Sequence, residues 1–433
     1  MLYNYIAIIL LIFVFLELII QKWVNFIRVK YDKSYKWPKK NVITNIITKK
    51  LDKNPKYTKE EFFIHSFYAF DTLLGTNNRP NENNNEFRFE KNREISTKYS
   101  IDKYGSRINK FFLKRSNSDI SSYGDSLCFC RFVDDNKTWQ YNLSKDLKKN
   151  IRNFGVGNHG LDQSFLKFKR NYEKKIDRPK KVIFLFGPET IRRNVSLWKH
   201  YYEFGNYLNF KPAFLFDKSK NKYVLYRIPK FRKKNYFDLK LLQDKIHNHD
   251  VFYKNKFLKY LWDKPYLLSL RNYGIRKLIL LIFYTYVYCK NKKKFNFKFI
   301  ESSKFYKKLD LLGGLYFDFK DKKSMFKDSF YIDGTLNIMK LANRFCNKRK
   351  IKCYFVIVPT YYDLKYIKNS KNKYFQLLID KCKGNDLQIV DPINKLLEYN
   401  SDKIYSDKAY GGHLNEKGNK ILANYLKINL NGL

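Results

Sequence analysis

The chain has 433 residues, enough for a large buried core and for either two domains or one domain with insertions. Lys plus Arg number 87 against 40 for Asp plus Glu, a formal net charge of +47 that attracts nucleic acid, anionic lipid or an acidic polymer. The lysine excess runs through the whole sequence, however, and no zinc-finger, helix-turn-helix or single-strand-binding motif accompanies it, which argues against specific nucleic-acid binding.

Residues 1–20 are almost wholly apolar, with Glu17 as the only charge, and about 20 such residues cross a bilayer as a helix. We therefore predict a transmembrane anchor over 1–22 and a single-pass membrane protein. A cleaved signal peptide is the alternative, although no basic residue precedes the apolar run and no small-residue cleavage site follows it. The positive-inside rule would keep the large domain cytoplasmic, but lysine is frequent everywhere, so the side of the membrane stays open.

Residues 23–60 are basic and lack clear periodicity, which indicates a juxtamembrane linker that either lies against anionic lipid or is solvated. The main domain is expected over 61–433. Within it, strands are expected at 118–123, 151–156, 182–186, 353–358 and 387–390, and helices at 138–147, 161–172, 334–349, 371–383 and 416–426. This alternation predicts a parallel sheet with helices on both faces and a ligand site at the carboxyl ends of its strands.

Residues 190–329 interrupt the alternation and are expected to form a large insertion rich in Lys, Tyr and Phe. Within the insertion, residues 278–288 are a continuous apolar and aromatic run between basic residues. The run is too short to span a membrane. It is either a buried core segment or an element that lies at a membrane surface.

Ser126 follows the first expected strand within Gly124-Asp125-Ser126 and precedes the helix at 138–147, so it falls at a strand-to-helix turn where its hydroxyl is available to attack. Gly-Asp-Ser is also ordinary turn chemistry, so a plain surface loop is the alternative. The Gly-x-Ser-x-Gly elbow of α/β-hydrolases is absent, because Cys128 occupies the final glycine position.

His413 stands in a loop directly before the last expected helix, a position suited to a general base. A neutral imidazole takes the proton of a serine and returns it to the leaving group, while a carboxylate such as Asp407 fixes its tautomer. A surface or helix-capping histidine is the alternative. The chain order of the three groups would be Ser, Asp, His.

Six cysteines are too few for a dense disulfide framework in a chain of this length, and none has the Cys-x-x-Cys spacing of a zinc site. Cys128 and Cys130 form a pair that could be read as a thiol nucleophile or metal ligands, but further ligands are lacking nearby. His247-Asn248-His249-Asp250 are adjacent residues, which rarely converge on one ion. We expect buried cysteines, no metal site and no organic cofactor.

Three short blocks of the sequence resemble the SGNH or GDSL hydrolase family. They are Gly124-Asp125-Ser126-Leu127, the segment Asn153-Phe154-Gly155-Val156-Gly157-Asn158, and His413-Leu414-Asn415 followed by Gly418. The likeness covers roughly 65–190 and 330–430, and includes the segment 134–143, which looks like the Asp-x-x-Thr-Trp segment of bacterial members.

The resemblance implies an α/β fold, a three-layer α/β/α sandwich (SGNH or flavodoxin-like) with a central parallel sheet of about five strands. It also implies Ser126 as the nucleophile, His413 as the base and an Asp that orients the base. The oxyanion donors would be the Ser126 backbone N–H, a backbone N–H of the second block at Gly155 or Gly157, and an Asn side chain.

Two positions depart from the family pattern. The Asp expected three residues before the histidine is Tyr410; Asp407 is the substitute, with Asp402 and a Ser-His dyad as alternatives. A further family block, the third in the family's order, lies between the segment 153–158 and the histidine. It normally reads Gly-x-Asn-Asp but is Gly187-Pro188-Glu189-Thr190 here, so its Asn is missing. Asn158 or Asn194 could supply the side-chain donor.

The expected protein is thus a membrane-anchored serine esterase or O-acyltransferase that forms an acyl-enzyme on Ser126. Its expected substrate is an acylated polysaccharide or a lipid ester, with O-acetyl as the favoured acyl group by family analogy. The alternative is a non-catalytic scaffold that binds glycan or lipid at a membrane.

Overall fold

The computed structural model describes residues 2–34, 68–90, 93–112, 117–199, 210–227, 246, 249–252, 279, 282–293, 322–406 and 412–430. Most of the predicted linker at 23–60 lies outside these residues, as do Asp407, Tyr410 and His247. The chain divides into two compact units. Unit 1 comprises 1–46, 200–207 and 231–319, and unit 2 comprises 47–199, 208–230 and 320–433. We describe each unit by itself.

Unit 2 is built on a five-stranded sheet with the order β11-β10-β7-β5-β6. The strands are β5 (Ile120–Gly124), β6 (Ile151–Asn153), β7 (Lys181–Phe186), β10 (Lys352–Ile357) and β11 (Ile389–Val390). All neighbouring pairs are parallel. The middle strand β7 is buried from Val182 to Phe186, as expected for a strand with helices on both faces.

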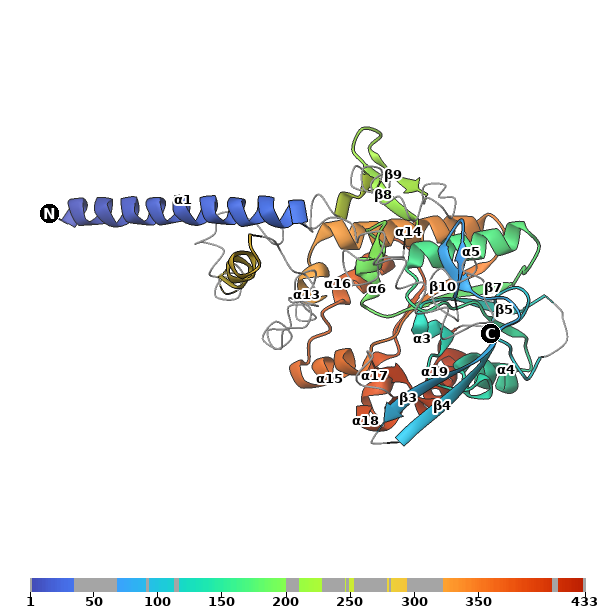
Figure 1. The fold of residues 1–433 in the computed structure, drawn as a ribbon. Coiled ribbons are helices and arrows are strands. Elements are labelled where there is room, and N and C mark those ends of the chain that lie inside the picture. The colour runs from blue at the N-terminus through green and yellow to red at the C-terminus, as the bar shows by residue number, and fades with distance from the viewer. Residues whose placement is uncertain are drawn as a thin grey trace. The chain divides into compact units, whose positions relative to one another are not determined.

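Helices cover both faces of this sheet (Figure 1). On one face lie α5 (Leu161–Glu173) and α14 (Ser329–Asn347), and on the other lie α4 (Trp139–Leu147) and α19 (Glu416–Asn429), each pair in mutual contact. The shorter helices are α3 (Ser126–Phe129), α6 (Thr190–Arg193), α13 (Lys322–Met325), α15 (Tyr361–Ser370), α16 (Gln376–Lys383), α17 (Ile393–Leu397), α18 (Ser401–Ile404) and the 3-10 turn η1 (Asp135–Lys137). The predicted three-layer α/β/α sandwich is confirmed.

Aromatic rings fill the core between the sheet and α5. Tyr123 of β5 stacks on Phe154 with 5.0 Å between ring centroids, and Phe168 of α5 contacts both Tyr123 and Phe184 edge to face. Helix α5 presents these residues because its apolar positions recur every three or four residues. The packing fixes the carboxyl end of β5, where Ser126 follows.

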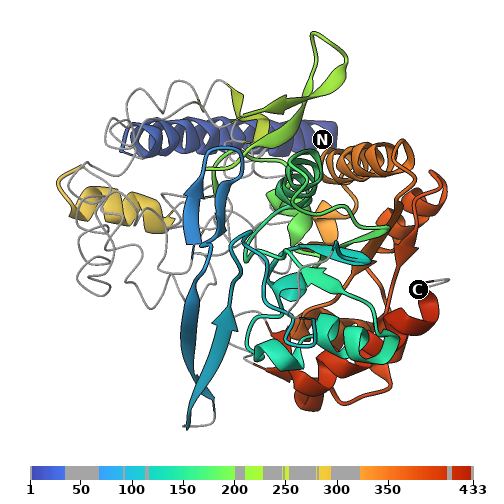
Figure 2. The same cartoon turned by 90° about the vertical axis from the view of Figure 1, so that its right-hand side faces the viewer.

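Four antiparallel pairs are found among the described residues of unit 2. They are β1 (Tyr68–Asp71) with β2 (Gly75–Asn78), β3 (Asn83–Glu90) with β4 (Arg93–Ser100), β8 (Ala213–Asp217) with β9 (Lys222–Tyr226), and β12 (Tyr405–Ser406) with β13 (His413–Leu414). Figure 2 shows the β3–β4 hairpin as a long ribbon that projects from the sheet. The β12–β13 pair carries His413, the residue predicted as a general base.

The element bounds differ most from expectation at two helices. The predicted helix at 371–383 is too long: α15 ends at Ser370 with Lys371 in the left-handed conformation (φ 54°), and the next helix begins only at Gln376. Helix α14 starts earlier than predicted, because Asp328 caps it by accepting a hydrogen bond from the Phe330 N–H at 3.0 Å.

Part of the expected insertion 190–329 belongs to the compact sheet unit. Residues 190–199 and 208–230 cluster with unit 2, and Trp198 is 2% exposed and stacks on Phe210. Residues 200–207 and 231–319 cluster instead with the N-terminal helix in unit 1.

In unit 1, α1 (Leu2–Ser34) is a single long helix. Its residues Tyr5–Trp23 are long and apolar enough to cross a membrane, and none of that window is buried. A second helical segment, 282–290, belongs to the same unit. Only part of the predicted run 278–288 is described, since 278, 280 and 281 lie outside the described residues.

Candidate active site

Ser126 is the first residue of α3, two residues after the last residue of β5, the strand beside the middle strand β7. Asp125 caps this short helix, and its Oδ1 accepts a hydrogen bond from the Leu127 N–H at 2.9 Å. Only glycine fits at position 124, since a Cβ there would lie 1.8 Å from the carbonyl oxygen of Leu185. The strand-to-helix turn predicted for Ser126 is therefore present, at the carboxyl end of the sheet.

The structure brings Ser126 and His413 together although they are 287 residues apart in the chain, with 2.9 Å between the serine Oγ and the histidine Nε2. His413 lies in β13, and its neighbour Asn415 caps α19 by accepting from the Gly418 N–H at 3.0 Å. Both side chains are buried, with 8% of Ser126 and 7% of His413 exposed. This is the geometry of a hydroxyl and its general base.

The position of His413 is set largely by backbone contacts. Gly412 has φ +69°, and a Cβ there would lie 2.3 Å from the Cβ of Tyr361, so the residue before the histidine must be glycine. His413 also pairs with Ser406 across the β12–β13 ladder. The edge of the Phe132 ring closes one side of the imidazole, with 5.3 Å between centroids.

Burial, together with the positive charges of Arg131 and Arg193, lowers the pKa of His413 to about 3. The imidazole is therefore neutral at physiological pH, which is the state that accepts a proton. Among the described residues, no group hydrogen-bonds to its Nδ1.

The two carboxylates considered as partners of His413 have different positions. Asp407 lies outside the described residues. Asp402 is exposed, and its Oδ1 accepts a hydrogen bond from the Tyr361 hydroxyl at 3.0 Å. The bonds described for Asp402 thus tie it to α15 and not to the imidazole.

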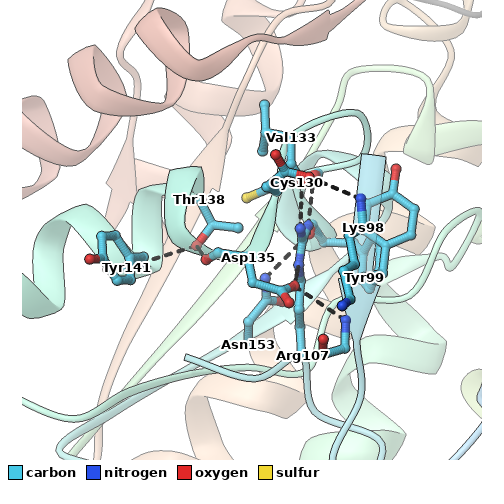
Figure 3. A network of polar contacts seen from close by, with 12 residues as sticks. Lys98, Tyr99, Arg107, Cys130, Val133, Asp135, Thr138, Tyr141 and Asn153 are labelled. Atoms are coloured by element: carbon cyan, nitrogen blue, oxygen red, sulfur yellow. Dashed lines mark hydrogen bonds and ion pairs between the residues drawn. The ribbon is translucent and has the colours of Figure 1, made fainter. Parts of the chain in front are cut away.

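The turn after Ser126 is held by Arg107, which is 2% exposed (Figure 3). Its Nη1 donates to the carbonyl oxygens of Phe129 and Cys130, both at 2.8 Å, and its Nη2 donates to that of Val133. Its Nε donates to Asp135 Oδ1 at 2.9 Å, so the buried charge is paired. A charged guanidinium with this many acceptors fixes the loop that follows the nucleophile.

Asp125 connects the nucleophile to the third block. Its Oδ2 accepts from the Gly187 N–H at 3.1 Å and from the Thr190 hydroxyl at 2.9 Å, and it lies 3.5 Å from Arg193 Nη1. Burial raises the pKa of Asp125, the Arg193 charge opposes the rise, and Glu189 adds to it. The carboxyl group thus anchors the loop after β7 beside Ser126.

Glu189 stands where the family has its Asn. Its Oε1 lies 3.4 Å from Arg193 Nη2, and its carboxylate approaches Gly187, whose added Cβ would lie 3.5 Å from Glu189 Oε2. The third block therefore presents an acid–base pair, Glu189 with Arg193, in place of an amide.

The second block folds over the nucleophile turn. A Cβ at Gly155 would lie 2.4 Å from the Phe129 N atom, so this glycine allows the close approach of the two loops. The Gly155 N–H donates to Asn153 Oδ1 at 2.9 Å, and its carbonyl accepts from Asn78 Nδ2 at 2.9 Å. The N–H group of Gly155 is thus already bonded. The N–H groups of Gly157 and Ser126, by contrast, have no acceptor among the described residues.

The two candidate asparagines lie in contrasting environments. Asn158 is exposed in the left-handed conformation (φ 66°), next to Gly157. Asn194 is 0% exposed; its Oδ1 accepts from the Leu161 N–H and its Nδ2 donates to the Thr335 hydroxyl, both at 2.9 Å. The Asn194 amide therefore joins α5 to α14.

Three residues that organise the site were not singled out in the sequence, namely Arg107, Asn78 and Lys167. Lys167 is 1% exposed and donates to the carbonyl oxygens of Phe154 at 3.0 Å and Gly105 at 3.3 Å, and burial lowers its pKa to about 7. Arg107 and Asn78 fall within segments that resemble the family, which was the available signal, but no local pattern indicated their burial.

The described residues contain no group of three or more His, Cys, Asp or Glu placed to hold a metal. Cys128 and Cys130 are both buried thiols. Burial raises the pKa of Cys128 well above its ordinary value and that of Cys130 to about 12. Neither is therefore a thiolate at neutral pH, as a nucleophile or metal ligand would have to be.

Comparisons with known proteins give distant matches only. No family model matches the chain, and no curated protein matches its sequence. Two solved structures are similar: a protein assigned to the lipolytic G-D-S-L family from Desulfitobacterium hafniense DCB-2, and a member of the same family from Veillonella parvula DSM 2008. Each is 8% identical with a TM-score of 0.33, and the matches cover 72% of this chain and 99% and 98% of the two others.

Proposed function

We propose that this protein is a serine hydrolase or acyltransferase that acts on an ester through an acyl-enzyme on Ser126. The 2.9 Å contact between Ser126 Oγ and His413 Nε2 carries the proposal. A buried, neutral imidazole bonded to a serine hydroxyl at a strand-to-helix turn is an arrangement that nucleophilic catalysis requires and that packing alone does not.

In this reaction Ser126 Oγ attacks the ester carbonyl while His413 Nε2 accepts its proton. The tetrahedral intermediate collapses, the bond to the alcohol oxygen breaks, and the imidazolium returns the proton to the leaving alkoxide. Water or an acceptor hydroxyl then attacks the acyl-enzyme by the same steps in reverse. The N–H groups of Ser126 and Gly157 are the proposed donors to the oxyanion.

The substrate proposed is an acylated polysaccharide or a lipid ester, and the acyl group proposed is O-acetyl. An anchor at the N-terminus would hold the site near a membrane, and the net charge of +47 favours an anionic polymer or surface. No metal or organic cofactor is needed by the steps above. The chemistry of the acceptor decides between hydrolysis and transfer.

A non-catalytic scaffold is the second candidate, and Glu189 favours it. A carboxylate at the position of the expected amide would oppose negative charge on an oxyanion unless Arg193, 3.4 Å away, compensates for it. Such a protein would bind glycan or lipid without turnover.

A fluorophosphonate probe separates the two candidates. The purified full-length wild type should be labelled, and Ser126→Ala should abolish labelling while its circular dichroism and melting temperature stay unchanged. A folded wild type that resists the probe would refute the enzyme. A panel of acetylated sugars against lipid esters then identifies the substrate class.

The partner of His413 is tested by a matched pair of variants. Asp407→Asn should slow acylation by roughly a thousandfold or more if Asp407 orients the imidazole. Asp402→Asn should change the rate little, since Asp402 is bonded to Tyr361. Unchanged activity of both variants would indicate a Ser-His dyad.

A further inference from the structure

A helical segment of unit 1 packs against α1 at the end of its apolar window. The indole Nε1 of Trp23 donates to the hydroxyl of Thr285 at 2.9 Å, and the rings of Phe26 and Tyr288 meet edge to face with 5.8 Å between centroids. Figure 1 shows the segment 282–290 end-on beside the long α1, so the two helix axes cross. The segment is therefore attached to α1 at a defined position along the helix axis, at Trp23 and Phe26.

That position along α1 coincides with the expected edge of the hydrocarbon layer of a bilayer. At 1.5 Å per residue, the window Tyr5–Trp23 is about 27 Å long, close to the roughly 30 Å of hydrocarbon in a membrane. Trp23 then lies at one edge of the hydrocarbon, where tryptophan is favoured because its ring is apolar and its N–H is polar. The segment bonded to Trp23 lies at the same edge.

The segment 282–290 has two distinct faces. Phe283, Tyr284, Val287 and Tyr288 are buried, at 8%, 1%, 0% and 5% exposure. The opposite face carries Ile282 and Tyr286, which are 52% and 51% exposed, and Cys289, which is also exposed. Positions 282, 286 and 289 follow the helical repeat and form one stripe, which we call the outer stripe.

Lysines border the outer stripe at its C-terminal end. Lys290 donates to the Tyr286 hydroxyl at 2.9 Å, and its ammonium lies 5.4 Å from the centre of that ring. Lys292 and Lys293 follow and are exposed. An apolar stripe bordered by cations matches the layer where acyl chains meet phosphate groups, because long lysine side chains reach the phosphates while their stems stay apolar.

We propose that the segment 282–290 lies in the interfacial layer of a phospholipid bilayer, with its outer stripe against the acyl-chain boundary and its lysines on anionic headgroups. The occupant of the stripe is thus lipid. The inference rests on the proposed anchoring by α1, and it adds a second membrane contact far away in the sequence. This contact would fix the rotation and depth of unit 1, which a single helix does not.

Cys289 gives a native probe of this contact, since the other five cysteines are buried. Full-length protein is labelled at Cys289 with an NBD maleimide and reconstituted into vesicles of phosphatidylcholine and phosphatidylglycerol. The NBD emission should be blue-shifted and quenched most strongly by nitroxide lipids labelled near the headgroup. Replacing Ile282 and Tyr286 together by Asp should abolish the blue shift.

Two controls make the result specific. Ile428→Asp, an equally drastic change at a 77% exposed position of α19, should leave the emission of the Cys289 label unchanged. A label placed by Lys420→Cys in a Cys289→Ser background, on the exposed face of the same helix, should report water.

The outcomes separate this inference from the anchor itself. Protein that floats with the vesicles while the Cys289 label emits as in water and is quenched by iodide would refute the interfacial contact and leave the anchor standing. Protein that does not float would refute both. A Cys289 label shielded equally in detergent and in vesicles would assign the stripe to a protein contact, which also overturns the proposal.

Discussion

The proposed nucleophile and its proposed base are held in place by different means. Ser126 sits on a turn that buried polar side chains from several segments fix: Arg107 holds the turn after it, and Asp125 ties it to the third block. His413 is placed mainly by backbone, through the β12–β13 pair and the close approach of Gly412 to Tyr361. We therefore expect the position of Ser126 to depend on side-chain hydrogen bonds and the position of His413 to depend on the backbone around it.

The largest effect is expected at the base itself. His413→Gln removes the proton acceptor of Ser126 and should slow fluorophosphonate labelling by about a thousandfold or more. The free energy of unfolding should change little, because Gln fills much of the same space. Stopped-flow labelling and urea denaturation measure the two quantities, and a labelling rate within tenfold of wild type would contradict the role of His413.

Arg107→Met tests the serine side. The change leaves Asp135 buried without its partner and removes three donors to the turn, and breaking such a buried pair costs about 3–5 kcal/mol of unfolding free energy. Lys137→Met, which breaks the partly exposed pair with Glu416, is the control and should leave the urea midpoint nearly unchanged. Equal effects of the two variants would show that Arg107 does not hold the turn.

Gly412→Ala tests the histidine side. A methyl group at φ +69° and 2.3 Å from the Tyr361 Cβ forces the backbone to shift, at a cost of about 1–3 kcal/mol. The labelling rate should fall even in protein that remains folded, because the backbone shift displaces the His413 imidazole from Ser126. Gly384→Ala is a control, since its added Cβ would meet only ordinary contacts, the nearest at 3.5 Å. A Gly412→Ala variant as active as Gly384→Ala would show that the close approach of Gly412 to Tyr361 does not position His413.

The smallest effect is a change in pH dependence. The labelling rate should fall as pH falls through the pKa of His413, because a protonated imidazole accepts no proton. Arg131 lowers that pKa, so Arg131→Gln raises it and moves the acidic limb to higher pH. The exposed Arg178→Gln is the control and should leave the limb in place. A limb that moves to lower pH would contradict the electrostatic assignment.

The sequence predicted the parts of the fold that depend on local pattern. Apolar runs such as 182–186 indicated the central strands. Gly124, Ser126, His413 and Gly418 stood in the order of the family's motifs. Lys371 marks a limit: nothing local distinguishes this lysine, which ends α15 in a left-handed conformation, from the lysines inside neighbouring helices.

The supporting residues escaped prediction for a physical reason. Among 87 basic residues, the sequence does not show which one is buried, so Arg107 could not be told from a surface arginine. Asn194 shows the converse. Its residue type suited an oxyanion donor, but its amide is used between α5 and α14, where only the packed structure reveals two groups that need it.

The most direct test of the central claim is to trap the acyl-enzyme. Wild-type protein is mixed with an activated acetyl ester, quenched in acid within milliseconds and digested, and the acetylated peptide is located by mass spectrometry. We expect one acetyl group on Ser126, absent in Ser126→Ala and strongly reduced in His413→Gln. Ester turnover with Ser126 unmodified, or an acetyl group on another residue, would contradict it.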